Sequence, residues 1–162
     1  MKNLIAIMVL TFSSTSILAG GTHDGDHGQA KFSVGEPANG EKVDRVFDVS
    51  MRDTMRFVFD PEFKDLHDGE VIQFNVKNDG VIVHEFSIGN AADQVEHAKM
   101  MREMPGMKHA DPNTVSLEAG ESATIIWRFK GDDTVVFACN VPGHFEAGMK
   151  HDLPIKGSKH SH

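Results

Sequence analysis

Three side chains that bind soft or borderline metal ions lie close together in the last quarter of the chain. Cys139 supplies a thiolate, His144 an imidazole and Met149 a thioether, with four residues between successive members. Pro142 and Gly143 favour a tight turn that can bring His144 back toward Cys139. Sulfur and imidazole donors select copper over hard cations. The segment therefore predicts a copper site in which Met149 is a weaker axial ligand.

A fourth ligand has to come from an earlier part of the chain, and His84 is the best candidate. It lies within the apolar run 81–86, where an unpaired imidazole would be costly. Taken alone, His84 would more often be a hydrogen-bonded structural histidine, and Met149 would more often fill the core. Cys139 alone would be an inert buried thiol in a minority of cases. Together, two His, one Cys and a distant Met form the ligand set of blue-copper electron-transfer sites.

The N-terminus and the single cysteine indicate an exported protein. Lys2, the apolar stretch 4–10 and the small residues up to Ala19 are typical of a signal peptide. The apolar stretch is too short for a membrane span of about 20 residues. We therefore expect a periplasmic protein with no membrane span in its mature form. In an oxidising compartment, metal coordination would protect the lone thiolate of Cys139.

Charge and length narrow the class of protein. A formal net charge of −8 argues against a nucleic-acid binder, which would carry clustered Lys and Arg on a basic background. The 162 residues suit one domain with a single core. We expect a monomer whose partners are copper ions and a periplasmic redox or copper-transfer protein, with no nucleic-acid partner.

Short β-prone runs separated by turn residues predict an all-β fold, a two-sheet Greek-key β-sandwich. The expected strands cover residues 45–49, 55–59, 71–77, 83–88, 114–117, 123–129, 134–138 and 150–155. Between Asn90 and Met104 the residues favour a short Met-rich helical insertion, which Pro105 and Gly106 would end.

The same pattern divides the chain into four segments. They are a signal peptide at 1–19, a flexible arm containing His and Asp at 20–42, the β-sandwich domain at 43–156 and a C-terminal tail at 157–162. The arm is expected to be flexible because its first part is polar and has no apolar periodicity.

Additional His and Met residues indicate extra copper capacity, because thioethers and imidazoles suit Cu(I). One group lies in and after the expected helix: His97, Met100, Met101, Met104, Met107 and His109. Smaller sets are Met51, Met55 and His67 in the domain, His23 and His27 in the arm, and His160 and His162 at the C-terminus. Packing is the alternative for the first group, since Met100 and Met104 would share one helix face.

The sequence resembles the cupredoxins, the plastocyanin and azurin superfamily, and among them the CopI-type periplasmic copper-tolerance proteins. The likeness covers about residues 43–156 and rests on Val83-His84-Glu85-Phe86 and on Cys139-Asn-x-Pro-Gly-His144-x-x-x-Gly-Met149. It implies an eight-stranded Greek-key sandwich, a type 1 copper bound by His84, Cys139, His144 and Met149, and a role in periplasmic copper handling. Many small electron carriers have Asn where this chain has Glu85, so a carrier-like potential does not follow.

Two functions remain open. One is copper tolerance: a type 1 copper-binding protein that sequesters copper, oxidises Cu(I) to Cu(II), and holds further copper ions on the additional His and Met residues. The other is a soluble electron-transfer protein that shuttles electrons between periplasmic redox partners. The excess of His and Met outside the four-ligand site favours copper tolerance. No catalytic residue is predicted. The one enzymatic activity considered is oxidation of Cu(I) at the copper site itself.

Overall fold

Side chains in β2 (Arg45–Arg52) alternate between a buried and an exposed face, as expected for a strand with the core on one side. Phe47, Val49 and Met51 are buried, whereas the residues between them are exposed or half-buried. The computed structural model describes residues 32–104 and 106–157 of the chain. Within this part, nearly half of the residues belong to strands, which form two sheets.

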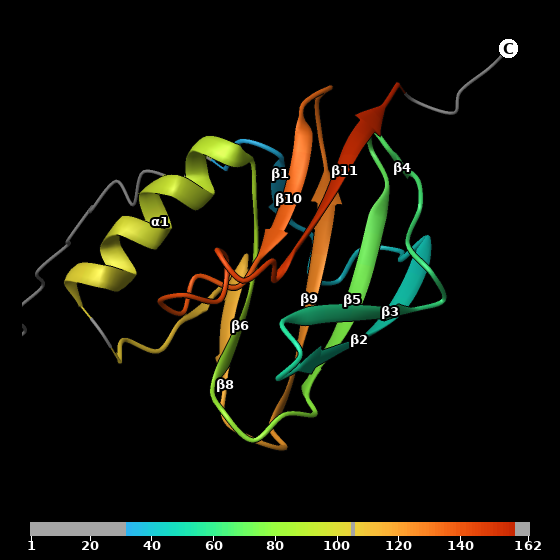
Figure 1. Ribbon diagram of the computed structural model, residues 1–162. Coiled ribbons are helices and arrows are strands. Elements are labelled where there is room, and N and C mark those ends of the chain that lie inside the picture. Colours follow the sequence, from blue (N-terminus) through green and yellow to red (C-terminus); the bar gives the residue numbers. More distant parts are fainter. Residues whose placement is uncertain (1–31, 105, 158–162) are drawn as a thin grey trace, which may run out of the picture.

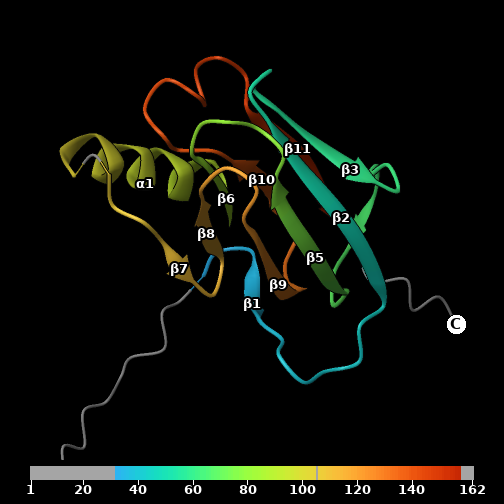
Figure 2. The ribbon, with the colours of Figure 1, turned by 90° about the horizontal axis from the view of Figure 1, so that it is seen from below.

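The two sheets face each other (Figures 1 and 2). The first has five strands in the order β1-β9-β5-β2-β3. Besides β2 they are β1 (Gly35–Pro37), β3 (Arg56–Asp60), β5 (Val71–Asn78) and β9 (Ser122–Phe129). The second has six strands in the order β4-β11-β10-β6-β8-β7. They are β4 (Leu66–His67), β6 (His84–Gly89), β7 (Ala110–Asp111), β8 (Thr114–Leu117), β10 (Thr134–Ala138) and β11 (Lys150–Lys156).

The expected all-β fold of two packed sheets with one helical insertion is confirmed. Each of the eight strands predicted from the sequence is present, with ends that differ by at most three residues. The structure adds β1, β4 and β7, which have three, two and two residues. These strands exist because they pair with the longer strands β9, β11 and β8, and they are too short to show a sequence period.

The ordered domain begins before Val43, the start expected from the sequence. Val34 is fully buried, and its carbonyl accepts a hydrogen bond from Trp127 Nε1 at 3.4 Å. β1 then pairs with β9 along the edge of the first sheet. The later part of segment 20–42, expected as a flexible arm, therefore belongs to the fold. The earlier part and the expected signal peptide lie outside the described residues.

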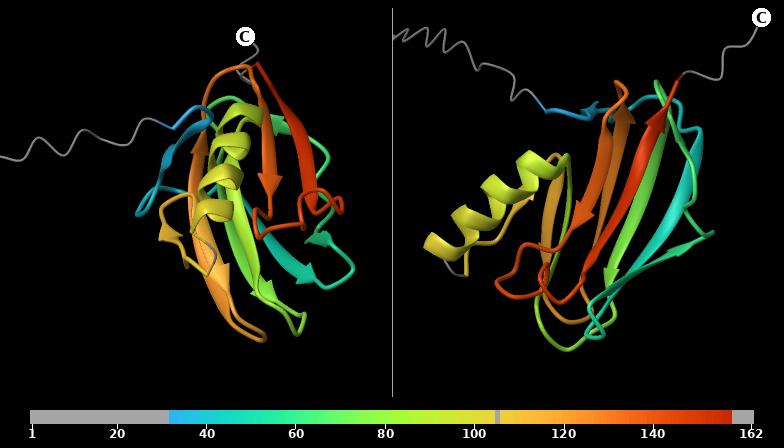
Figure 3. Two further views of the ribbon diagram at one scale, coloured as in Figure 1. Left: turned by 60° about the vertical axis from the view of Figure 1, so that its left-hand side comes forward. Right: turned by 45° about the horizontal axis from the view of Figure 1, so that its top comes forward.

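One helix, α1 (Ala91–Glu103), lies along the outer face of the second sheet (Figure 3). It begins with a capping box, in which the side chains of Asn90 and Asp93 each accept from the other's backbone amide, at 3.0 and 2.9 Å. Its buried residues are Gln94 and Met101. The Gln94 side-chain amide donates to one backbone carbonyl of β6 and one of β10, at 3.3 and 2.8 Å. In the described part of the chain, no helix is long and apolar enough to cross a membrane.

Phenylalanines fill the space between the sheets. Phe74 of β5, Phe86 of β6 and Phe137 of β10 are fully buried, and the ring centroids of each pair are 5.5 Å apart. Aromatic pairs at this spacing add about 0.5–1.5 kcal/mol beyond their buried area. Phe86 lies two residues after His84, and Phe137 lies two residues before Cys139. The aromatic core therefore holds the two strands that carry these candidate ligands.

Three strand ends meet at one end of the sandwich (Figure 1). β10 is antiparallel to both β6 and β11, with Ala138 opposite Ser87 and Lys150. The start of β6, the end of β10 and the start of β11 are therefore neighbours. The loop between β10 and β11 connects two of these ends. This topology places His84 beside the segment that begins with Cys139.

We expect Phe137→Ala to lower the free energy of unfolding by about 3–5 kcal/mol, because the lost ring leaves a cavity between the sheets. Urea unfolding followed by circular dichroism measures this loss. Val46→Ala is the control: Val46 is 46% exposed on β2, and its truncation should cost no more than about 0.5 kcal/mol. Equal losses in the two variants would contradict the role given to the aromatic core.

Candidate metal centre

Three side chains with metal-binding atoms converge at this end of the sandwich. The ligand atoms of His84, Cys139 and His144 all lie within 4.8 Å of one another. Cys139 Sγ is 3.3 Å from His144 Nδ1, and the ring centroids of the two histidines are 5.0 Å apart. His84 and Cys139 are fully buried, whereas His144 is half-buried. The group is therefore enclosed by protein and reaches solvent through one histidine.

Asp53 fixes the orientation of the His84 ring. Asp53 Oδ1 lies 3.0 Å from His84 Nε2, so this nitrogen carries the proton and donates it. The other ring nitrogen, Nδ1, is buried and has no hydrogen-bond partner among the residues that the structure describes. The amide of Val81 donates to the Asp53 carboxylate and, as the main cause, lowers the pKa of Asp53. The free lone pair of His84 is therefore on Nδ1.

Asn78 positions the loop that leads into His84. Its fully buried side chain donates from Nδ2 to the carbonyl oxygens of Ile82 and Leu117, at 2.7 and 2.9 Å. Its Oδ1 accepts from the amide of Gly80 at 2.9 Å. Leu117 is the residue that pairs with His84 between β6 and β8. Asn78 therefore ties the loop before β6 to the end of β8.

The thiol of Cys139 lies in an apolar environment near the backbone amides of Glu85 and Val141. The amide of Glu85 is 3.3 Å from Cys139 Sγ and points at it as a donor. Burial raises the pKa of the Cys139 thiol to about 12, and the hydrogen bond from Glu85 opposes this only partly. At neutral pH the metal-free thiol is therefore protonated. A metal ion that binds the sulfur displaces this proton.

Backbone hydrogen bonds close the loop between β10 and β11. The His144 amide donates to the Val141 carbonyl at 3.0 Å, and the Met149 amide donates to the His144 carbonyl at 3.0 Å. The Cys139 amide in turn donates to the Met149 carbonyl at 3.1 Å. Gly143, with φ of 89°, makes the turn before His144 in a conformation that glycine adopts without strain. Met149 is fully buried in the same core cluster as Cys139.

The protonation state of His144, a neutral imidazole at neutral pH, suits metal binding. Burial is the main cause that lowers the pKa of His144. A neutral imidazole at neutral pH offers a lone pair to a cation. One thiol and two imidazoles beside a buried thioether match the preferences of copper, whereas structural zinc sites prefer closed sets rich in Cys. The residues present therefore fit a copper ion.

Similarity to curated proteins identifies the family. The copper-resistant cuproprotein CopI of Vibrio cholerae is 37% identical over 168 aligned positions, which cover 95% of this chain and 99% of that protein. The chain belongs to the CopI family. The protein of the same name from Rubrivivax gelatinosus is 44% identical over 131 positions, covering 80% of this chain and 78% of that protein. No protein-family model matches the chain.

Solved structures of auracyanins show that this CopI-family chain has the cupredoxin fold. Reduced auracyanin from Roseiflexus castenholzii superposes with a TM-score of 0.56 at 20% identity, covering 69% of this chain and 96% of the auracyanin. Auracyanin B gives a TM-score of 0.55 at 22% identity, covering 75% and 96%. The fold implied by the resemblance to cupredoxins is confirmed.

The structure gathers three of the four ligands predicted for this CopI-family chain. His84, Cys139 and His144 come together, and Met149 is buried where the loop returns to the sheet. The group lies where β6 begins and β10 ends. That these side chains bind copper stays a prediction.

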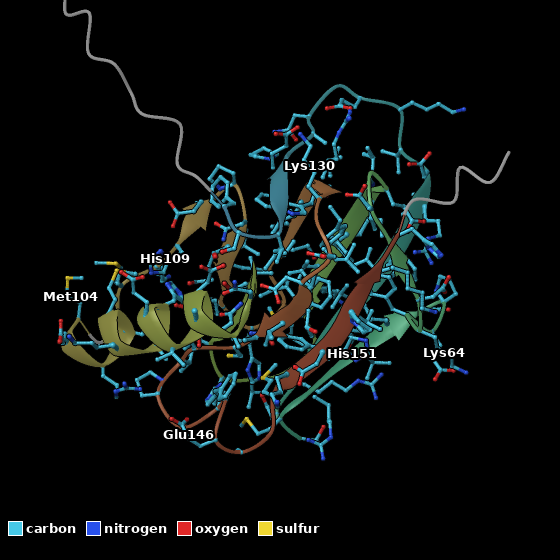
Figure 4. The ribbon with its side chains drawn as sticks, turned by 90° about the horizontal axis from the view of Figure 1, so that it is seen from above. Lys64, Met104, His109, Lys130, Glu146 and His151 are labelled. Atoms are coloured by element: carbon cyan, nitrogen blue, oxygen red, sulfur yellow. The ribbon has the colours of Figure 1, made fainter. Side chains whose placement is uncertain are left out.

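The predicted helix group is only partly brought together. The rings of His97 and His109 are neighbours, with centroids 4.7 Å apart. Met101 is buried, Met100 and Met107 are half-buried, and Met104 is 43% exposed. Figure 4 shows Met104 at the end of α1 and His109 beside the helix. Met100 and Met104 therefore do not form the packed face that their spacing suggests.

Met51 lies near the end of β2, whereas His67 of β4 lies near the start of β2, so the two cannot share a small site. Met51 is buried near the end of β2, and Met55 lies in the turn that follows. His67 Nδ1 is 3.8 Å from Glu70, which pairs with Arg45 at the start of β2. Six residues of strand, about 20 Å, separate the two ends. The terminal histidines lie outside the described residues: His23, His27, His160 and His162.

The polar residues that orient the ligands carry only weak signals in the sequence. Asp53 and Asn78 look like ordinary turn formers next to strands. Asn78, however, continues the inward phase of residues 72, 74 and 76, so alternation marks it as a buried polar residue. Glu85 stood out as a departure from the electron carriers but not as a residue with partners of its own. Its signal is a charged residue inside an apolar strand.

In metal-free protein we expect Cys139 to react slowly with iodoacetamide at pH 8. With its pKa raised to about 12, only about one thiol in 10,000 is a thiolate, against about a quarter at an ordinary pKa of about 8.5. Alkylation should be roughly a thousand-fold slower in folded protein than in urea-unfolded protein. Mass spectrometry over time measures both rates. Comparable rates would contradict a buried, protonated thiol.

Proposed function

We propose that the chain binds one copper ion through His84, Cys139 and His144, with Met149 as a weaker axial ligand. We further propose that it serves copper tolerance in the periplasm, where it sequesters copper. The relatives named copper-resistant cuproproteins match it at 37% and 44% identity, the first along nearly its whole length. The signal peptide expected at residues 1–19 supports export.

One observation carries the copper proposal. A buried imidazole nitrogen without a hydrogen-bond partner in the described structure, His84 Nδ1, belongs to the same small group as the buried thiol of Cys139. The unpaired nitrogen is unfavourable in an apolar environment, and burial also disfavours the thiolate form of Cys139. A cation that accepts both lone pairs satisfies them at once.

The surrounding residues hold these donors before an ion arrives. Asp53 keeps the proton of His84 on Nε2, and the amide of Glu85 orients the sulfur of Cys139. Because the loop hydrogen bonds fix His144 and Met149 as well, coordination requires little rearrangement. Copper in such a set changes between Cu(I) and Cu(II) with little movement of its ligands.

In copper tolerance the metal ion is cargo. Capture of Cu(I) by the thiolate and imidazoles withdraws it from the free pool. Loss of one electron to an external acceptor, such as an oxidised redox protein, converts the captured ion to the less permeant Cu(II). This cuprous oxidation is the enzymatic activity that we propose. It calls for a periplasmic partner or another one-electron acceptor.

An electron shuttle is the second candidate, and one surface feature favours it. Val81 is 82% exposed and Ile82 is 41% exposed, in the loop that leads into His84. Their amides contact Asp53, the partner of His84, so these apolar side chains lie beside the candidate centre. A redox partner can dock on such a patch. Fast electron self-exchange that Val81→Lys slows would favour the shuttle over sequestration.

We expect wild-type protein with one equivalent of Cu(II) to develop a strong visible charge-transfer band, and Cys139→Ser to lose it, because the band requires the thiolate. Absorption spectra during titration measure this. Ala138→Ser introduces the same residue, serine, at the buried position next to Cys139, and it should keep the band. Circular dichroism checks that all three proteins are folded. A band that persists in Cys139→Ser would contradict the proposed site.

A further inference from the structure

A second cluster of metal-binding side chains lies on the other face of β6 from the candidate copper centre. The ligand atoms of Glu85, His97 and His109 all lie within 4.8 Å of one another. Glu85 comes from β6, His97 from α1, and His109 from the segment before β7, beside the helix (Figure 4). Successive side chains of a strand point to opposite faces. Glu85 therefore turns toward the helix while His84 turns toward Cys139.

The cluster is buried, which is costly for a carboxylate. The side chain of Glu85 is 0% exposed, and those of His97 and His109 are 15% and 7% exposed. Glu85 Oε1 is 2.8 Å from His97 Nε2, and Oε2 accepts from Ser116 Oγ at 3.3 Å. Ser116 also ties this carboxylate to the segment of His109, because its Oγ accepts from the His109 amide at 3.0 Å.

His109 is oriented as a metal ligand would be. Its Nδ1 lies 2.8 Å from Asp111 Oδ2, so Nδ1 carries the proton. Its Nε2 is buried and finds no hydrogen-bond partner in residues 32–104 and 106–157. A carboxylate that holds one nitrogen of a histidine while the other binds an ion is a recurrent arrangement in metal sites.

A purely structural cluster explains only part of this geometry. A hydrogen-bonded pair of Glu85 and protonated His97 would satisfy those two residues. It would leave Nε2 of His109 buried and unpaired, with the charged ring of His97 only 4.7 Å away between centroids. A bound cation accepts one lone pair from each of the three residues. It therefore accounts for all three side chains at once.

We propose that Glu85, His97 and His109 bind a borderline divalent metal ion, Cu(II) or Zn(II). Two imidazoles and one carboxylate suit such ions, whereas Ca²⁺ and Mg²⁺ prefer oxygen alone and Cu(I) prefers sulfur. The 2.8 Å between Glu85 and His97 is compatible with both atoms binding one ion at about 2.0–2.2 Å. Three protein ligands leave one position open for water or another ligand.

This site goes beyond the proposed function, because none of its side chains belongs to the first centre. It also differs from the Met-rich copper cluster expected from the sequence, since a carboxylate takes the place of the thioethers. The two sites are nevertheless connected. The backbone amide of Glu85 donates to Cys139 Sγ, while its side chain belongs to the second site.

The test uses the full chain with Cys139→Ser, so that the first centre lacks its thiolate. Zn(II) and Cu(II) are added separately, and the imidazole NMR signals of His97 and His109 are followed. Zn(II) should shift these signals, or Cu(II) should broaden them, at about one equivalent. The metal that acts at lower concentration identifies the preferred ion. Because the signals are assigned to single residues, binding at the terminal histidines is not mistaken for this site.

Variants of the ligands and of Asp111 separate a metal site from a structural cluster. Glu85→Gln and His97→Ala should each weaken binding at least about 100-fold, and Asp111→Asn should weaken it about 10–100-fold. Asp132→Asn, an exposed site with the same change of charge, is the control and should leave the affinity unchanged. Circular dichroism checks folding. If Glu85→Gln does not fold, His97→Ala and Asp111→Asn decide.

Three results would overturn the proposal. In the first, neither metal changes the signals of His97 and His109. In the second, His97→Ala binds as tightly as the parent protein. In the third, only Cu(I) binds and Met101→Leu abolishes it, which would indicate a thioether site. The visible band of wild-type protein tests the first centre separately, so each proposal can fail without the other.

Discussion

Burying polar donor atoms away from water is the constraint on which the rest of this structure depends. A buried group without a hydrogen-bond partner costs about 1–3 kcal/mol. Nδ1 of His84 is in that position, and the fold keeps it there beside the buried thiol of Cys139. The rings of Phe86 and Phe137 stack between them and the rest of the core, and Asp53 and Asn78 fix the loops. The stability of the sandwich thus holds these candidate ligands in place.

β6 shows how one strand can serve two sites. All six of its residues are buried, because the aromatic core covers one face and α1 covers the other. His84 and Glu85 are consecutive, so they point to opposite sides of the sheet. Gln94 of α1 donates to β6 and β10 and accepts from Asn140, the residue after Cys139. The helix therefore stabilises the first site from behind while it supplies a histidine to the second.

Much of the fold could be predicted because the strands carry strong local signals. Val71 to Asn78 alternates, and turn residues separate the longer strands. The spacing of Cys139, His144 and Met149 in the loop after β10 also predicts a copper site. β1, β4 and β7 could not be predicted, since they form only by pairing with other strands. For the same reason the sequence did not show that the fold begins before Val43, with the buried Val34 and with β1 paired to β9.

The parts of the sites that depend on tertiary contacts were harder to foresee. Asp53 lies 31 residues before His84, and no local pattern links them. Glu85 could be seen as unusual, but its partners His97 and His109 come from a helix and a loop that only the fold brings near. The methionines in and after α1 drew attention as copper ligands for their residue type alone. Their type suggested copper, whereas the buried carboxylate and imidazoles form the more compact set.

Copper tolerance by this centre requires that the sulfur of Cys139 and the imidazoles of His84 and His144 bind the same copper ion. X-ray absorption spectroscopy at the copper edge, on full-length protein loaded with one equivalent of copper, tests it most directly. We expect one short copper–sulfur contact together with imidazole nitrogens in the first coordination shell. A shell of nitrogen and oxygen alone would contradict it, because copper would then be bound elsewhere.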